Sequence, residues 1–216
     1  MESIQMTTLK SHLNLHQRSM DYLSEDKNVV FTFGRFNPPT KGHQRVIDLV
    51  QEIAEQQHGD HMILVSQSVD KPPKRTGRLN PLTSKNPLPY DVKLAFLKQM
   101  FPTVNIVENA PSNPWDVPEW LANAGYVNVT MVVGSDQMED FSRLVESSAG
   151  IFNNFQLVSS GIRNPDASGV SGMSATKARE AARLNDIGKF RVATGWSGEF
   201  AERLMEATRI SMGSDV

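Results

Sequence analysis

The feature that most constrains the fold is the apolar run Val29-Val30-Phe31-Thr32-Phe33, which leads through Gly34 and a Pro-rich loop into a helical pattern. The run is short and apolar enough for a strand buried on both faces. Similar runs at 62–65, 104–107, 129–133 and 154–158 alternate with stretches of helical spacing. We therefore expect a Rossmann-like α/β fold, in which five parallel strands form a doubly wound sheet. The C-terminal region is expected to be helical, over about 173–184, 186–193 and 197–209.

The chain of 216 residues is long enough for one such domain. We expect a helical appendage over 1–28, a main domain over 29–194, and a C-terminal helix and tail over 195–216. Apolar residues in the first segment have roughly helical spacing, which suits a helix packed on the main domain. A helix that binds a partner or a second copy of the chain is the alternative.

Composition narrows the classes of function. The net charge of −2 gives no reason to expect general nucleic-acid binding. The chain has no cysteine, which excludes disulfides, thiolate zinc sites and a cysteine nucleophile. The histidines show no zinc-ligand spacing, so we expect no metal held by the protein alone. No apolar run approaches the roughly 18 residues of a membrane span, and no secretory signal is evident, so a cytoplasmic location is expected.

The first candidate site is the segment from Gly34 to His43. A glycine at the strand end allows close approach of a ligand, and Thr40 can cap a helix that begins with Lys41, Gly42 and His43. The N–H groups and dipole of such a helix start suit a phosphate. A plain strand-to-helix turn would explain Thr40 and the prolines. It would not explain why three basic residues, Arg35, Lys41 and His43, crowd one helix start. The segment is neither Gly-x-Gly-x-x-Gly nor a Walker A loop.

A second helix start also carries hydroxyls and cations. Residues 171–179 read Ser-Gly-Met-Ser-Ala-Thr-Lys-Ala-Arg, and Ser171 or Ser174 is a suitable N-cap. Thr176, Lys177 and Arg179 crowd the first turns of this helix. An ordinary capped amphipathic helix is the alternative interpretation.

The first segment, Gly34-x-Phe36-x-Pro38-x-Thr40-x-Gly42-His43, resembles the Gly-x-Phe-x-Pro-x-His/Thr-x-Gly-His motif of the nucleotidylyltransferase superfamily. The resemblance implies that His43 contacts the triphosphate of a nucleotide and stabilises charge at its α-phosphate. Gly42 would let the nucleotide lie close to the helix. Thr40 stands where many members have a first histidine, and its hydroxyl can bond a phosphate oxygen without carrying charge.

The second segment resembles the Ile-Ser-Ser/Gly-Thr-x-x-Arg motif of the same superfamily, although Ala175 and Thr176 straddle the expected positions. The resemblance implies that Ser174 and Thr176 supply hydroxyls to the β- and γ-phosphates. Arg179 would neutralise the departing pyrophosphate. The implied catalytic residues are thus His43, Thr40, Lys41 and Arg179. The implied nucleotide-binding residues are Gly34, Arg35, Phe36, Gly42, Gly134, Asp136, Ser174 and Thr176.

Three further features fit the resemblance. Gly134-Ser135-Asp136 is similar to the family's Gly-x-Asp, which implies that Asp136 would bond a ribose hydroxyl or bind Mg²⁺ through water; a structural N-cap is the alternative. Trp115 is a candidate for stacking on the base of the acceptor, and core packing is its alternative. Lys74, Arg75 and Arg78 form either a lid over the triphosphate or a solvated loop.

Four segments support a narrower resemblance: the first motif, Lys85 to Tyr90, Val-Gly-Ser-Asp and Gly-Met-Ser-Ala-Thr-Lys. Taken together, they are similar to adenylyltransferase-like proteins of large tailed bacteriophages. Those proteins resemble nicotinamide-mononucleotide adenylyltransferases. The expected reaction transfers the NMP part of a nucleoside triphosphate, ATP being favoured, to a phosphorylated small-molecule acceptor such as nicotinamide mononucleotide. Mg²⁺ would be bound through the triphosphate. A cytidylyltransferase making a CDP-sugar or CDP-alcohol is one alternative. A nucleotide-binding or virion-associated protein with weak or no turnover is another.

Overall fold

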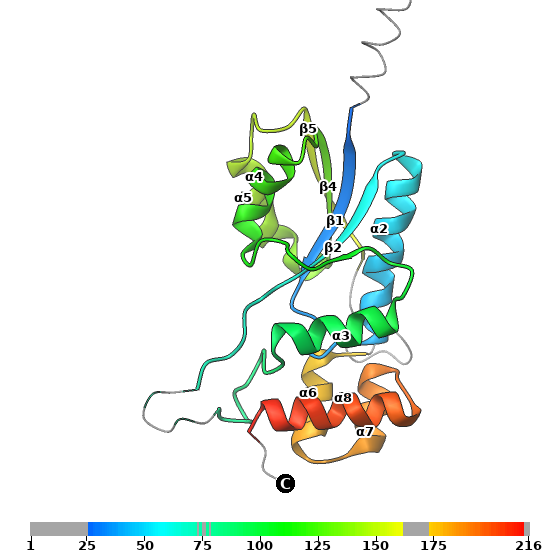
Figure 1. The fold of residues 1–216 in the computed structure, drawn as a ribbon, viewed down its shortest axis with the longest axis vertical. Coiled ribbons are helices and arrows are strands. Elements are labelled where there is room, and N and C mark those ends of the chain that lie inside the picture. Colours follow the sequence, from blue (N-terminus) through cyan, green and yellow to red (C-terminus); the bar gives the residue numbers. More distant parts are fainter. Residues whose placement is uncertain (1–25, 73, 75–76, 78, 162–172, 214–216) are drawn as a thin grey trace, which may run out of the picture.

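The computed structural model describes residues 26–72, 74, 77, 79–161 and 173–213. Its centre is a sheet of five parallel strands (Figure 1). The strands are β1 (Asn28–Gly34), β2 (Asp60–Val65), β3 (Ile106–Val107), β4 (Asn128–Val133) and β5 (Asn154–Ser159), and their order is β3-β2-β1-β4-β5. The predicted Rossmann-like α/β fold is confirmed.

Helices cover the sheet and extend it at one end. They are α2 (Gln44–Gln56), α3 (Tyr90–Met100), α4 (Val117–Asn123), α5 (Met138–Ser147), α6 (Ala175–Arg183), α7 (Ile187–Thr194) and α8 (Gly198–Ser211). Three 3₁₀ turns lead into helices: η1 (Lys41–His43), η2 (Pro114–Asp116) and η3 (Ser135–Gln137). Figure 1 shows α6, α7 and α8 grouped together, with α3 between them and the sheet.

Alternation along β1 builds two separate cores. Phe31 and Phe33 face α4 and α5, in a cluster that also contains Leu121 and Leu144. Val30 points the other way, into a cluster with residues of α2 and α3 such as Ile47. Because side chains alternate across a strand, a strand that is apolar throughout supplies both faces of the sheet.

The predicted strand at 104–107 is wrong at its start, because β3 comprises Ile106 and Val107 alone. The N–H of Val104 donates to Phe101 O at 3.2 Å, which closes a turn and removes Val104 from the ladder. Apolar content predicted this strand, whereas backbone hydrogen bonding set its length.

A third core joins the C-terminal helices. Ala178 and Ala182 of α6, Phe190 of α7 and Leu204 of α8 pack in one cluster, which also takes in Leu88 before α3. The boundary expected at residue 195 therefore falls inside a shared core. Residues 1–25 of the expected N-terminal appendage lie outside the described residues.

Chain direction locates the crevice in the sheet. From β1 the chain moves outward to β2 and β3, then returns to β4 on the other side of β1 and continues to β5. The helices after β1 and β4 therefore diverge, and a ligand crevice forms at the carboxyl ends of these two strands. Gly34 and Gly134 stand at that point. No described helix is long and apolar enough to cross a membrane.

Replacing Phe190 with alanine tests whether the C-terminal helices are part of the cooperative fold. The ring is fully buried in the third core, so we expect Phe190→Ala to lower the free energy of unfolding by about 3–5 kcal/mol. Urea unfolding followed by circular dichroism measures the change. Val192→Ala, on the same helix but 78% exposed, is the matched control and should change it by less than about 0.5 kcal/mol. Equal effects of the two variants would contradict the shared core.

Candidate functional site

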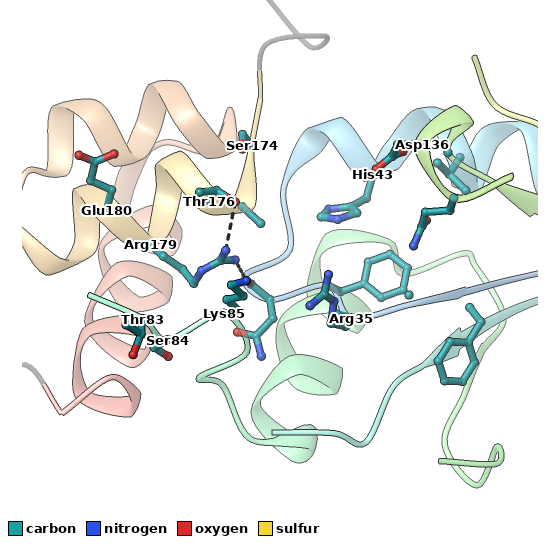
Figure 2. A pocket seen from close by; sticks show the side chains of 18 of the residues that line it. Arg35, His43, Thr83, Ser84, Lys85, Asp136, Ser174, Thr176, Arg179 and Glu180 are labelled. Carbon is teal, nitrogen blue, oxygen red and sulfur yellow. Dashed lines mark hydrogen bonds between the residues drawn. The ribbon is translucent and has the colours of Figure 1, made fainter. Parts of the chain in front are cut away.

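A cavity of about 770 Å³ opens at this crevice. Four segments line it: residues 32–37 with His43 and Val46, residues 81–85, Gly134 with Asp136 and Gln137, and part of the stretch 174–183. Figure 2 shows Arg35, His43 and Asp136 toward one end and Thr83, Ser84 and Glu180 toward the other, with Arg179 between them. The cavity thus lies where both candidate motifs meet.

Gly34 makes room for the aromatic ring that follows it. A Cβ on Gly34 would lie 2.7 Å from the Phe36 ring, closer than van der Waals contact allows. Phe36 itself has φ of 46°, a left-handed conformation that is strained for a bulky side chain. Its ring is buried and lies 4.9 Å from the His43 ring, centroid to centroid. The glycine therefore admits the ring against which His43 packs.

Thr40 orients the ring of His43 by contacts to its Nδ1. The Thr40 N–H donates to His43 Nδ1 at 2.9 Å, and the Thr40 hydroxyl lies 3.1 Å from the same nitrogen. With Nδ1 accepting, the ring proton lies on Nε2. Thr40 is buried and does not line the cavity, whereas His43 does. The contacts observed for Thr40 are thus with His43, and its bond to a phosphate stays a prediction.

Arg179 joins the two motifs. Its guanidinium donates to Asn37 O at 2.7 Å and to the Thr176 hydroxyl at 3.1 Å (Figure 2). Burial and the nearby charge of Arg35 lower the pKa of Arg179, and Asp70 opposes the shift. Two guanidinium groups close enough to repel each other form a site that suits an anion.

The loop after β2 is held by one carboxylate. Asp70 accepts hydrogen bonds from the Ser84 hydroxyl at 2.8 Å, from Lys85 N–H at 2.7 Å and from Asn86 N–H at 2.8 Å. Partial burial favours a higher pKa for Asp70, but these bonds and the charge of Arg179 outweigh it and hold the pKa below its usual range. The loop thereby presents residues 81–85 to the cavity.

Asn37 ties this loop to the first motif. Its amide accepts from Leu88 N–H at 3.0 Å and donates to Leu88 O at 3.1 Å and to Asn86 Oδ1. Asn86 in turn donates to the backbone and hydroxyl of Ser68. Both asparagines are buried, so these bonds satisfy groups that water does not reach.

Gly134 and Asp136 form the wall at β4. A Cβ on Gly134 would lie 2.5 Å from Asp136 Oδ1, so a larger residue would displace this carboxylate. Asp136 lies in η3, and its exposed side chain lines the cavity. Both residues were predicted for the site from the resemblance of Gly134-Ser135-Asp136 to the family's Gly-x-Asp.

Several other predicted residues also line the cavity: Gly34, Arg35, Phe36, Ser174 and Thr176. Others do not. Lys41 directs its ammonium to the Trp196 ring, 5.0 Å from the centroid, and a Cβ on Gly42 would meet Met173 rather than open space. Trp115 is 51% exposed, which rules out core packing, and it is not among the residues that line the cavity.

The proposed lid is only partly described. Lys74 is exposed, and Arg75, Arg78 and Ser171 lie outside the described residues. Sequence reasoning missed Asn37, Asp70 and the cavity-lining Thr83 and Ser84. The resemblance of Lys85 to Tyr90 to phage adenylyltransferase-like proteins was the available signal, because this stretch adjoins Thr83 and Ser84.

No described group of three histidine, aspartate or glutamate side chains could hold a metal ion. The cavity contains two carboxylates, Asp136 and Glu180. Mg²⁺ is commonly held by one or two carboxylates, water and the phosphates of a substrate. The donor set therefore fits a metal that arrives with a phosphate ligand.

Comparison with known proteins agrees with this geometry. The profile of the cytidylyltransferase-like family matches residues 31–181, which contain the second half of β1, all of β2 to β5 and most of α6. The chain belongs to this family of nucleotidyltransferases. No curated protein matches the chain in sequence.

Solved structures share the fold at low identity. The nicotinic acid mononucleotide adenylyltransferase of Plasmodium falciparum complexed with NaAD superposes with a TM-score of 0.55 and 15% identity. The same enzyme complexed with APC gives 0.53 and 15%. Each match covers 86% of this chain and 97% of the other. These matches support the Rossmann-like fold over most of the chain.

The role of Asp70 predicts a pH dependence of stability. Asp70→Asn should lower the free energy of unfolding at pH 7 by about 1–2 kcal/mol, since it weakens charge-assisted hydrogen bonds. Because folding depresses the pKa, this contribution is present above the ordinary value of 3.8 and is lost as pH falls through the lower folded value. The difference between wild type and variant should therefore shrink below about pH 4.

Urea unfolding at pH 7, 5 and 3 measures the difference. Glu146→Gln, an exposed carboxylate-to-amide change on α5, is the control and should have little effect at any pH. A difference for Asp70→Asn that is constant with pH would contradict a charge-based role.

Proposed function

We propose that the protein transfers AMP from ATP to a phosphorylated small-molecule acceptor, nicotinamide mononucleotide or a similar nucleotide, and releases pyrophosphate. The observation that carries the proposal is the convergence of the two motifs on one cavity through the bond from Arg179 to Asn37. Family membership supports nucleotidyl transfer. The adenylyl part rests on the fold neighbours, whose names describe a nicotinic acid mononucleotide adenylyltransferase.

The proposed site binds the triphosphate between two cationic walls. Arg35 and His43 lie on the wall formed by β1 and η1, and Arg179 lies on the α6 wall with the hydroxyls of Ser174 and Thr176. His43 offers the Nε2 proton to an oxygen of the α-phosphate, since its Nδ1 is occupied by Thr40. Arg179 faces the β- and γ-phosphates. Such preorganised donors stabilise charge that grows in the transition state.

The chemistry requires no protein nucleophile. An oxygen of the acceptor phosphate, already ionised at neutral pH, attacks the α-phosphorus, and a new P–O bond forms. The bond from the α-phosphorus to the bridging oxygen of the β-phosphate breaks, and its electron pair leaves with pyrophosphate. No proton has to be removed from the acceptor, so the residues act by positioning and charge stabilisation.

Mg²⁺ is proposed as the metal, bound through the triphosphate, and it would neutralise phosphate charge during transfer. Asp136 is the carboxylate beside β4 that would hold it through water, or else bond a ribose hydroxyl. The protein itself would contribute few direct ligands.

The second candidate is a cytidylyltransferase, favoured by the family description. The two candidates differ in the base that the cavity accepts and in the acceptor. Pyrophosphate release should be measured with ATP and with CTP, each against nicotinamide mononucleotide, nicotinic acid mononucleotide and a panel of phosphorylated sugars and alcohols. Turnover with ATP and a nucleotide acceptor supports the proposal. Turnover with CTP alone supports the second candidate, and nucleotide binding without turnover supports a binding protein.

His43→Ala is the variant that tests the chemistry in this assay. Loss of one preorganised donor to the α-phosphate should lower kcat by about 10²–10³-fold while the fold is retained. The control is His58→Asn, an exposed histidine at the end of α2 whose φ of 50° asparagine also tolerates. If His43→Ala turned over as fast as wild type, His43 would have no catalytic role.

Thr40→Val separates orientation of His43 from direct phosphate binding. The valine keeps the buried shape but removes the hydroxyl beside Nδ1, so kcat should fall roughly tenfold, the value of about one hydrogen bond, with KM for ATP little changed. Thr40→Ser should retain most activity. Steady-state kinetics measures both constants. A raised KM with unchanged kcat would indicate instead that Thr40 meets the triphosphate itself.

A further inference from the structure

Lys93 of α3 is a fully buried cation that the proposed reaction does not use. Its ammonium donates to Ser66 O at 2.6 Å and to Ser68 O at 3.2 Å, in the backbone that leaves β2. In the part of the chain that the structure describes, no carboxylate forms an ion pair with it. A buried charge without a counter-ion is costly, so its place beside the cavity calls for a role.

The surroundings of Lys93 are cationic. Burial, and then the charge of Arg35, lower the pKa of Lys93 to about 8. The charged groups on neighbouring segments are Arg35 after β1, Asp70 after β2 and Arg179 on α6, and Tyr90 lies one turn away on α3. Asp70 is already engaged by the loop and by Arg179, and the Tyr90 hydroxyl donates to Glu108 O. An anion bound at Arg35 would reduce the repulsion between Lys93 and Arg35.

We propose that Lys93 is a positioning residue for the phosphates: its buried ammonium fixes the loop after β2, and its positive charge, added to that of Arg35, favours an anion bound at Arg35. The inference rests on the proposed function, because it takes that anion to be the triphosphate of the nucleotide. Lys93 does not line the cavity, so it acts through Arg35 and through the backbone of Ser66 and Ser68.

Linkage gives the direction of the effect. An anion at Arg35 reduces the repulsion felt by Lys93, so the bound nucleotide holds the proton of Lys93 more tightly than the free protein does. By reciprocity, the protein with protonated Lys93 binds the nucleotide more tightly. Affinity should therefore fall as pH rises through about 8, and a shift of one pH unit in the Lys93 midpoint corresponds to a tenfold difference in affinity.

The test is an NMR titration of the full-length protein with ¹³Cε-labelled lysine, and the Lys93 signal is assigned from its absence in Lys93→Arg. The probe is an ATP analogue with an α,β-methylene bridge, added with Mg²⁺. We expect a midpoint near 8 without the analogue and roughly one unit higher at saturation. Lys98, exposed on the same helix and paired with Glu108, is the internal control and should not respond to the analogue.

Binding measurements between about pH 7 and 9.5 give the reciprocal readout. The Kd of wild type should rise about 5- to 10-fold over this range, whereas Lys93→Arg, which stays charged, should bind with nearly constant Kd. Lys93→Met should bind weakly at every pH. Were Lys93→Met to fail to fold, the comparison of wild type with Lys93→Arg would still decide the question.

A saturating analogue that leaves the Lys93 midpoint unchanged would overturn the inference and leave nucleotide binding intact. Wild type and Lys93→Arg with the same pH dependence would overturn it as well. Absence of analogue binding at every pH would instead remove the proposed function, and the inference with it.

Discussion

The arrangement of the site depends on one hydrogen bond, from the Arg179 guanidinium to the carbonyl oxygen of Asn37, between residues 142 positions apart. It connects the helix that ends the family domain to the loop that follows the first strand. The side chain of Asn37 extends the connection to Leu88 and Asn86, so the loop after β2 is held against the same point. Three segments that the sheet alone would leave separate thus enclose one cavity. Because each bond is buried or half-buried, breaking one leaves polar groups that water replaces poorly.

Electrostatics explains why this cavity calls for an anion. Burial lowers the pKa of both Arg179 and Lys93, and the nearby charge of Arg35 lowers each pKa further, so Arg35 disfavours the charged form of both. Asp70 offsets part of this effect on Arg179, while its Oδ2 accepts three hydrogen bonds from the loop. A polyphosphate would relieve the remaining repulsion and would meet donors that are already in place.

Much of the fold was predictable because short apolar runs and helical periodicity are local signals, and all five strands lie where such runs occur. Arg35 and His43 were likewise predictable as site residues, because basic residues crowd one helix start in the first motif. Lys93 and Asp70 carried no such signal, because their roles come from contacts between segments far apart in the chain. The sequence placed Thr40 at a helix start, but it did not predict the contacts of Thr40 with the ring of His43. The predicted length of β3 was wrong for a related reason. The N–H of Val104 donates to Phe101 O in a turn, so it is not available to a neighbouring strand.

The central claim is that both motifs grip one triphosphate, with His43 on one side and Arg179 on the other. A crystal structure with the α,β-methylene ATP analogue and Mg²⁺ tests it most directly. The account predicts the α-phosphate within hydrogen-bond distance of His43 Nε2 and the β- or γ-phosphate on Arg179, in the cavity between β1, β4 and α6. An analogue bound elsewhere, or one whose phosphates contact neither residue, would contradict the account.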